Sequence, residues 1–285
     1  MASRDKVLII KTGYSETLDP ETSGNVSLGD VLRSTVLLHA FPPGTHQVVW
    51  LVDADAAPLL RDNPWIQRVM TVNTFTPFQL MREPFSAVIN LEKDPGICAM
   101  ADSVPAERHY GFAFDTAAGR PTAHQYAGNA LALAQDRETR QKAGRSWEDV
   151  LFEMVGARYG GERLILGHVP DGAAVHDIGL NYRVGTKFPL KAWPADHWTR
   201  LHNVLAPAYS ISWQPAVDDV AHIENYIDWV ASCRLLVTND SLGLHIAIGL
   251  GRPVVALFGP TPADALADYP NVKKLVAPGS DTCPP

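Results

Sequence analysis

Short apolar runs alternate with amphipathic stretches along the whole chain. Four runs in the first half have the length and continuous hydrophobicity of buried parallel strands, at residues 7–10, 47–52, 66–72 and 84–91. Residues 125–159 are expected to be largely helical. Because strands that alternate with helices pair in parallel, this half is expected to form an α/β domain with a doubly wound sheet.

The second half repeats this pattern, with apolar runs that predict strands at residues 178–182, 209–213, 235–237 and 254–258. Pro194 suits the start of one helix, and residues 224–233 have the pattern of another. Residues 167–172 (GHVPDG) carry the glycine, proline and Asp-Gly signals of a turn-rich linker. We therefore expect two domains, residues 1–170 and residues 171–285.

The stretch from residue 235 to residue 263 (LLVTNDSLGLHIAIGLGRPVVALFGPTPA) predicts a strand, a polar turn, a helix and a second strand. In such a βαβ unit the helix begins beside the carboxyl end of the first strand, where α/β proteins bind ligands. Asp240, Ser241 and Gly243 fall at this helix start, and His245 follows within about a turn. Backbone N–H groups and the helix dipole favour an anion such as a phosphate there. The spacing alone is equally consistent with Asp240 as a helix cap and His245 as a core residue.

Composition limits the classes of partner. The chain is 46% hydrophobic and 19% charged, and its net charge of −7 argues against nucleic acid or an anionic membrane as the main partner. No apolar stretch is long enough for a transmembrane segment, and the N-terminal apolar run is too short for a signal peptide. Three widely spaced cysteines offer neither a disulfide framework nor a CxxC metal site. A cytoplasmic protein is expected, with peripheral membrane contact left open.

The segment TNDSLGLHIAIGLGRPVVALFGPT resembles the donor-site motif of the family 9 glycosyltransferases, the ADP-heptose:lipopolysaccharide heptosyltransferases and their relatives. This resemblance implies a GT-B architecture, in which two Rossmann-like domains face a cleft. The first half would then bind the acceptor, and the second half would bind the nucleotide-sugar donor. The residues that the resemblance assigns to the donor in this segment are Asn239, Asp240, Ser241, Gly243 and His245.

The loop RVGTKFPLKAWPADHW, which follows the strand at residues 178–182, resembles a second part of the same family. Lys191 and the Trp-Pro pair after it stand at the family's spacings, and the next helix follows directly. The resemblance places Lys191, Thr186 and Lys187 where the family meets the donor phosphates. A lysine at position 187, in place of a second hydroxyl residue, adds positive charge there. Without the resemblance, Lys191 would be typical of a solvated surface lysine.

The first helix opens at residues 27–30 (SLGD), and its apolar positions lie mostly on one side. The family carries its proposed catalytic base in a Gly-Asp-Val at this place, so the resemblance assigns that role to Asp30. An inserted segment separates Asp30 from the first strand, which departs from the family pattern. A Gly-Asp at a helix start is by itself usually a cap, so the assignment rests on the resemblance.

These segments together predict a metal-independent transferase that moves a heptose-like sugar from a nucleotide diphosphate, with ADP-heptose as the expected donor. Asp30 would accept the proton of the attacking hydroxyl, while Lys191, Lys187, Thr186 and the helix N–H groups would stabilise the leaving diphosphate. The acceptor stays open between a glycan, a lipid-linked sugar, a protein and a small molecule. No cofactor is expected besides the nucleotide sugar, because neither half carries the G-x-G-x-x-G of dinucleotide-binding proteins.

Other features bear on this prediction. Asp53-Ala54-Asp55 is similar to the metal-binding DxD of another glycosyltransferase fold, but its place between a strand and a helix indicates surface caps. Glu92-Lys93-Asp94 ends the strand at residues 84–91, where substrate contacts are allowed but not required. The inserted first loop, a short connection after residue 213 and the missing family-type C-terminal helix leave an alternative open. That alternative is a non-catalytic sugar-nucleotide-binding or scaffold protein derived from this family.

Overall fold

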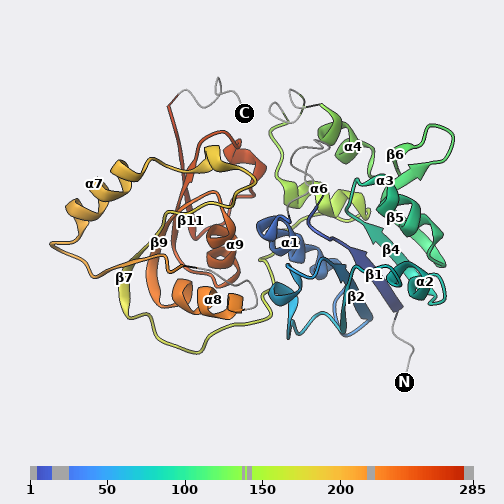
Figure 1. Ribbon diagram of the computed structural model, residues 1–285, viewed down its shortest axis with the longest axis horizontal. Coiled ribbons are helices and arrows are strands. Elements are labelled where there is room, and N and C mark those ends of the chain that lie inside the picture. The colour runs from blue at the N-terminus through green and yellow to red at the C-terminus, as the bar shows by residue number, and fades with distance from the viewer. Residues whose placement is uncertain (1–4, 15–25, 137–138, 140–142, 217–221, 279–285) are drawn as a thin grey trace. The chain divides into compact units, whose positions relative to one another are not determined.

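The computed structural model describes residues 5–14, 26–136, 139, 143–216 and 222–278. The chain divides into two compact units, Met1–Gly167 and His168–Pro285. They are coloured from blue to yellow-green and from yellow-green to red in Figure 1. The division falls inside the turn-rich segment at residues 167–172, where the sequence predicts a linker.

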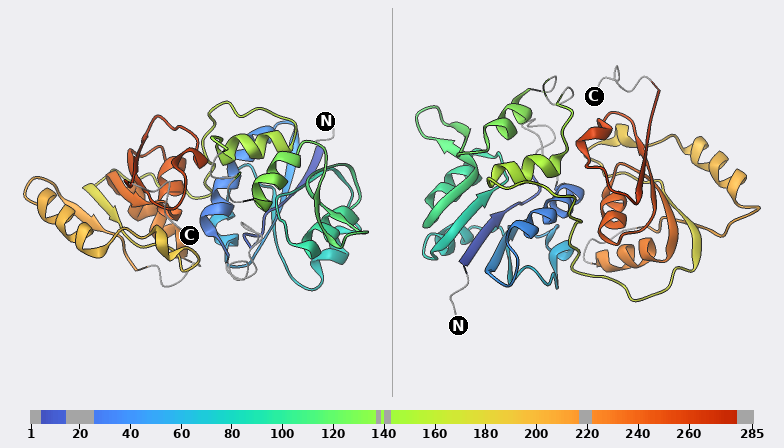
Figure 2. Two further views of the ribbon diagram at one scale, coloured as in Figure 1. Left: turned by 90° about the horizontal axis from the view of Figure 1, so that it is seen from above. Right: turned by 180° about the vertical axis from the view of Figure 1, so that it is seen from behind.

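Unit 1 is built on a six-stranded sheet in the order β3-β2-β1-β4-β5-β6. Its strands are β1 (Asp5–Ile10), β2 (His46–Val52), β3 (Arg68–Thr71), β4 (Phe85–Asn90), β5 (Ala106–Asp115) and β6 (Arg120–Ala123). Strands β1 to β5 are parallel, and β6 pairs antiparallel with β5 as a hairpin at one edge of the sheet (Figure 2). The winding direction reverses between β1 and β4, so the carboxyl ends of these two strands form the topological switch point of unit 1.

The strands expected in the first half are confirmed, but β6 has no apolar run and the sequence analysis missed it. The helices of unit 1 are α1 (Leu28–Ser34), α2 (Thr76–Leu80), α3 (Pro95–Ser103), α4 (Gly128–Gln135) and α6 (Trp147–Met154), with 3-10 turns η1 (Thr35–Ala40) and η2 (Ala57–Leu60). The apolar segment that follows Asp30 is therefore not one α-helix, because α1 ends at Ser34 and η1 continues from Thr35. The hydroxyl of Ser34 donates to the carbonyl of Asp30 (2.8 Å), and that of Thr35 donates to the carbonyl of Leu32 (2.7 Å). Such side-chain bonds compete with the helical ladder where α1 tightens into η1.

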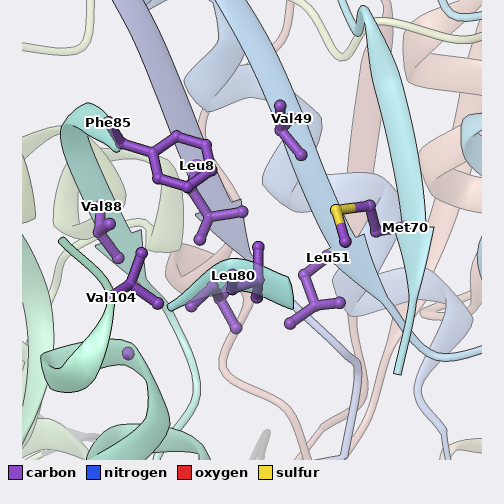
Figure 3. Close-up of a cluster of buried hydrophobic side chains, with 10 residues drawn as sticks. Leu8, Val49, Leu51, Met70, Leu80, Phe85, Val88 and Val104 are labelled. Carbon is purple, nitrogen blue, oxygen red and sulfur yellow. The ribbon is translucent and has the colours of Figure 1, made fainter. Parts of the chain in front are cut away.

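The core of unit 1 explains why its strands carry continuous apolar runs. Residues 7–10 of β1 and 48–52 of β2 are all buried, as expected for parallel strands covered on both faces. Figure 3 shows one cluster on the sheet, in which side chains of four strands pack with Leu80 of α2 and Val104. Its members from the strands are Leu8, Ile10, Val49, Leu51, Met70, Phe85 and Val88.

Unit 2 has a five-stranded sheet in the order β11-β10-β9-β7-β8, with every pair parallel. The strands are β7 (His176–Asn181), β8 (Ile211–Trp213), β9 (Cys233–Asn239), β10 (Val254–Phe258) and β11 (Val272–Val276). The winding direction reverses between β7 and β9, so their carboxyl ends form the switch point of this unit. The sequence analysis predicts the first four strands but misses β11, whose two lysines break its apolar pattern.

The helices of unit 2 are α7 (Ala195–Leu205), α8 (Ile223–Ala231) and α9 (Leu242–Gly249), with short turns η3 (Pro189–Lys191) and η5 (Ala263–Ala265). Pro194 is the N-cap residue of α7, at the helix start that the sequence predicts, and Trp198 anchors that helix in a core with Ile178, Leu180 and Val237. In neither unit does a helix of the described residues combine the length and the hydropathy needed to cross a bilayer.

The close approach of β5 to β4 makes a prediction about Gly111. Its φ is +85°, and a Cβ there would lie 2.0 Å from the carbonyl oxygen of Asn90. Gly119, in the β5–β6 turn, has a φ of +62°, but a Cβ there would meet nothing within 4 Å. Gly111→Ala is expected to lower the free energy of unfolding by about 3 kcal/mol or more, and Gly119→Ala by only about 1 kcal/mol. Urea denaturation measures both losses, and equal losses would contradict the close approach.

Candidate functional site

A network of buried side chains joins the carboxyl ends of β7 and β9 in unit 2. Asn181 is the last residue of β7 and is fully buried. Its Nδ2 donates to Thr238 Oγ1 (2.6 Å) and to Ser241 Oγ (3.0 Å), and its Oδ1 accepts from the Tyr226 hydroxyl (2.5 Å). Burial raises the pKa of Tyr226, so this hydroxyl stays protonated and keeps donating. The network fixes Ser241 at the start of α9.

The packing of this network explains why residue 243 is a glycine. A Cβ at Gly243 would lie 2.5 Å from Asn181 Nδ2 and 2.6 Å from the Tyr226 hydroxyl oxygen. Ser241 is the N-cap residue of α9, but its side chain makes no capping bond. The hydroxyl accepts from Asn181 instead, and so the helix start is not capped in the way that its sequence allows. Asn181 and Tyr226 belong to the site, and the sequence analysis assigned neither of them.

Asn239, the last residue of β9, closes the loop that carries the predicted phosphate-binding residues. Its Oδ1 accepts from the backbone N–H of Trp193 (3.0 Å), and its Nδ2 donates to the carbonyl of Tyr182 (2.8 Å). The side chain is fully buried, so both ends of the amide are committed to backbone at the two ends of this loop. In the structure Asn239 therefore positions the loop that holds Thr186, Lys187 and Lys191.

Lys191 and Asp240 form an ion pair at the carboxyl end of β9. Lys191 Nζ lies 2.7 Å from Asp240 Oδ2, and the two side chains are 19% and 11% exposed. Burial by itself would raise the pKa of Asp240, but the positive charges of Lys191 and His245, with a hydrogen bond from Thr261, lower that pKa to about 2. His245 is buried in the first turn of α9. The structure thus brings Lys191, Asp240 and His245 together.

A second lysine lies close to this pair. The Nζ atoms of Lys187 and Lys191 lie 5.9 Å and 5.1 Å from the centroid of the Phe188 ring, so one aromatic ring is shared by two cations. Thr186 precedes them in an exposed turn. Lys191 thus lies at the start of α9 and shares the Phe188 ring with a second cation, an arrangement that suits a diphosphate.

In unit 1 the inserted segment before Asp30 leaves the first helix in place. The backbone N–H of Ser27 donates to the carbonyl of Gly13 (2.9 Å), so the chain that leaves β1 returns to the same point before α1 begins. Most of the inserted segment, residues 15–25, lies outside the described residues. Because the insertion is closed at its base, α1 presents Asp30 to Lys11 at the carboxyl end of β1, where the two side chains form a buried ion pair.

Positive charges surround the carboxylate of Asp30. Arg33 Nη2 lies 2.9 Å from Asp30 Oδ1, while Lys11 pairs with Oδ2. Burial would raise the pKa of Asp30, but Lys11, Arg33 and Lys93 together hold it well below its usual range. The cationic groups of Arg33 and Lys93 also lie 5.6 Å and 5.7 Å from the ring centroid of Trp147 in α6. Asp30 is therefore a carboxylate at any ordinary pH.

Glu92 is the second acid at the switch point of unit 1, where the sequence analysis allowed substrate contacts but did not require them. Its side chain is fully buried, and its Oε1 accepts from Thr12 Oγ1 (2.9 Å) and from the backbone N–H of Gly13 (2.7 Å). The same oxygen lies 3.5 Å from Lys11 Nζ. The sequence feature that could have pointed to Glu92 as a site residue is the charged run Glu92-Lys93-Asp94 directly after the buried strand β4.

The structure gives the DxD-like pair a local role. Asp53 Oδ1 accepts from the backbone N–H of Asp55 (2.9 Å), and its Oδ2 accepts from the Tyr14 hydroxyl. This hydrogen bond and burial raise the pKa of Tyr14 to about 12. The carboxylate of Asp53 thus ties the loop after β1 to the loop after β2. The predicted helix cap is wrong, because the N-cap residue of η2 is Ala56 and no side chain caps that turn.

Comparison with known proteins connects unit 2 to one family. Residues 221–281 match glycosyltransferase family 9 (heptosyltransferase), and this segment contains the donor-side residues from Asn239 to His245. Lipooligosaccharide heptosyltransferase 2 of Haemophilus influenzae is 28% identical over 145 residues, which are 41% of this chain and 38% of that protein. Lipopolysaccharide heptosyltransferase 2 of Salmonella typhimurium is 38% identical over 111 residues, 30% of this chain and 32% of that protein. The matches thus span about a third of these relatives' own length.

Solved structures share the fold over almost the whole chain. E. coli heptosyltransferase WaaC with ADP superposes with a TM-score of 0.63 at 19% identity and covers 96% of this chain and 94% of that one. The family 9 glycosyltransferase from Veillonella parvula gives 0.62 at 15% identity and covers 97% and 88%. The expected class, two α/β units of GT-B type, is confirmed.

The Lys191–Asp240 pair predicts a pH dependence of stability. Since the pKa of Asp240 falls from 3.8 to about 2 on folding, its ionised form stabilises the fold fully above the unfolded value, and this contribution is lost as the pH falls through about 2. The difference in unfolding free energy between the parent and Asp240→Asn should therefore shrink by about 2 kcal/mol as the pH falls from about 5 to about 2.

Urea denaturation at a series of pH values checks this expectation. In a Lys191→Met background most of the shrinkage should disappear, because the main cation that lowers the pKa of Asp240 is gone. A difference that is the same at every pH would contradict the assigned pairing.

Proposed function

We propose that this chain is a member of glycosyltransferase family 9 and transfers a sugar from a nucleotide diphosphate to an acceptor hydroxyl. The observation that carries the proposal is the partly buried Lys191–Asp240 pair at the start of α9, whose aspartate lies inside the segment that matches the family. A cation that a carboxylate orients beside a helix N-terminus can hold a phosphate and a polar sugar at one place.

The donor is proposed to be an ADP-linked heptose. One relative in structure, E. coli heptosyltransferase WaaC, is known with ADP-2-deoxy-2-fluoro heptose. In this chain Lys191, Lys187 and the N–H groups at the start of α9 would bind the diphosphate, with Thr186 beside them. Asp240 would then accept hydrogen bonds from sugar hydroxyls, since a carboxylate has acceptor capacity beyond its bond to Lys191. Asn239 and Asn181 would act by holding this loop and this helix start in place.

The proposed reaction is a direct displacement at the anomeric carbon. The acceptor oxygen bonds to that carbon, the bond from the carbon to the diphosphate oxygen breaks, and the hydroxyl proton passes to Asp30. Lys191, Lys187 and the N–H groups of α9 stabilise the charge that grows on the diphosphate, so no metal is needed in this scheme. The curated relatives are named lipopolysaccharide and lipooligosaccharide heptosyltransferases, and we propose an acceptor of that kind here.

The low pKa of Asp30 sets the timing of proton transfer. A carboxylate held by Lys11 and Arg33 is a weak base and does not ionise a free hydroxyl. The hydroxyl becomes strongly acidic only once its oxygen bonds to the electron-poor anomeric carbon. Asp30 then accepts the proton late in the reaction. Each carboxylate oxygen of Asp30 has two lone pairs, so the hydroxyl of the acceptor substrate can donate to an oxygen that a cation also contacts.

The first prediction concerns the base. Asp30→Asn should lower kcat for transfer from ADP-heptose to a heptose-free lipopolysaccharide core by about 1,000-fold, because the amide cannot take the proton. Calorimetric titration with ADP should give a Kd close to that of the parent, since ADP binds unit 2. Asp55→Asn, at an exposed acid of the same unit, is the matched control and should keep parental turnover. Equal turnover in Asp30→Asn would remove the assigned role.

The second prediction concerns the phosphate contact. Lys191→Ala should raise the Kd for ADP at least about tenfold, because a charge-assisted contact contributes about 1.5–3 kcal/mol. Lys273→Ala, at an exposed lysine of β11, should leave the Kd unchanged. Isothermal titration calorimetry compares the two variants, and indistinguishable affinities would argue against the contact. The same titration with GDP and UDP tests the proposal that the nucleobase of the donor is adenine.

A further inference from the structure

The proposed reaction uses Asp30 and the cations that lower its pKa, but it gives no role to the buried carboxylate of Glu92 nearby. Lys11 and Glu92 are both fully buried, and Asp30 is 3% exposed. Lys11 pairs with Asp30 and lies 3.5 Å from Glu92 Oε1. One buried ammonium group is thus shared by two carboxylates, of which only one is proposed to accept a proton.

Proton transfer to Asp30 changes the charge balance of this triad. While Asp30 is ionised, Lys11 has two anionic partners, but a protonated Asp30 no longer neutralises it. A buried cation that loses its counter-ion is strongly destabilised. Among the described residues, Glu92 is the second carboxylate that pairs with Lys11, and it can neutralise the ammonium group when Asp30 is protonated.

We propose that Glu92 is a positioning residue of the transfer reaction, which holds Lys11 and supplies its counter-ion when Asp30 takes the acceptor proton. The inference rests on the proposed function, because it requires Asp30 to be the base. It assigns Glu92 no contact with the substrates, so donor affinity should not depend on it.

Hydrogen bonds from both strands of the switch point fix Glu92 beside Lys11. At the end of β1, Thr12 Oγ1 and the N–H of Gly13 donate to the oxygen that faces Lys11. After β4, the side chain of Asn90 accepts from the backbone N–H of Glu92 (3.0 Å) and donates to its carbonyl (3.1 Å). The carboxylate therefore stays in place whether or not Asp30 carries a proton.

Three other charged groups lie near Asp30, and the variants that test the role of Glu92 leave them unchanged. Arg33 comes from α1 and Lys93 follows Glu92, and both lower the pKa of Asp30. Glu148 is buried in the first turn of α6, next to Trp147, over whose ring those two cations lie. Variants of Lys11 and Glu92 leave all three groups unchanged.

The test is a set of four proteins: the parent, Glu92→Gln, Lys11→Gln and the double variant, with kcat measured against pH. Glu92→Gln should lower kcat about tenfold and leave the KM for ADP-heptose unchanged, because protonation of Asp30 would then remove the second of these two carboxylate charges from beside Lys11. Lys11→Gln should shift the acid limb of the kcat profile up by at least about one pH unit, since a cation is lost and two carboxylates remain together. The double variant should shift that limb back down, because the repulsion from Glu92 is then also gone.

A purely structural role of Glu92 predicts a different pattern. Loss of its hydrogen bonds would act equally in both backgrounds and would leave the acid limb of Lys11→Gln unmoved. Thr12→Val in the Lys11→Gln background removes one neutral donor to Glu92 and no charge, and it should leave that limb in place. ADP binding to unit 2 and cooperative thermal unfolding identify the variants that have folded.

The outcomes separate this inference from the proposed function. A limb that moves down in the double variant, together with an inactive Asp30→Asn, supports the role of Glu92. An unmoved limb with an inactive Asp30→Asn overturns the role of Glu92 and leaves the base assignment standing. An active Asp30→Asn overturns the base assignment, and the role of Glu92 falls with it.

Discussion

Polar groups buried at the ends of parallel strands must find their partners inside the protein, and this constraint shapes both switch points. At the end of β1 and β4, Lys11 is enclosed between Asp30 and Glu92. At the end of β7, the side-chain amide of Asn181 bonds to a network of hydroxyl groups. At the end of β9, the side-chain amide of Asn239 bonds to the backbone of a loop. Because an unpaired buried polar group is costly, these contacts hold the geometry on which the chemistry depends.

The two switch points solve this problem with different chemistry. Unit 1 buries ionised groups and places the carboxylate of Asp30, the proposed base, among cations, which keeps it charged and weakly basic. Unit 2 buries neutral amides and hydroxyls and leaves its charged pair, Lys191 and Asp240, partly exposed beside α9. A neutral framework around a partly solvated ion pair suits the binding of an anionic donor. A buried charge cluster suits a proton acceptor whose affinity for protons must be set by its neighbours.

The sequence predicts most strands because local patterns carry them. The apolar runs give β1, β4, β7, β9 and β10, and a strand end followed by a polar helix start points to Asp240. Lys191 was assigned only through the family resemblance, and its ion pair with Asp240 was not predicted. Other features depend on contacts between residues far apart in the chain. Thr12 and Glu92 are 80 positions apart, and the glycine at 243 is explained by Asn181 and Tyr226, which lie on other elements. Asn239 has the right place for a donor ligand, but only the fold shows that backbone groups occupy its amide. Strands β6 and β11 lack a continuous apolar run, so the sequence pattern does not predict them.

Transfer of labelled heptose from ADP-heptose to a heptose-free lipopolysaccharide core, in the presence of excess EDTA, tests the central claim most directly. The lysines and N–H groups of unit 2 are proposed to stabilise the leaving diphosphate without a metal. Label should therefore enter the acceptor at the same rate with and without the chelator, and one ADP should be released for each sugar transferred. Tight binding of ADP-heptose with no label in any acceptor, or transfer that stops with EDTA, would contradict a metal-independent transferase.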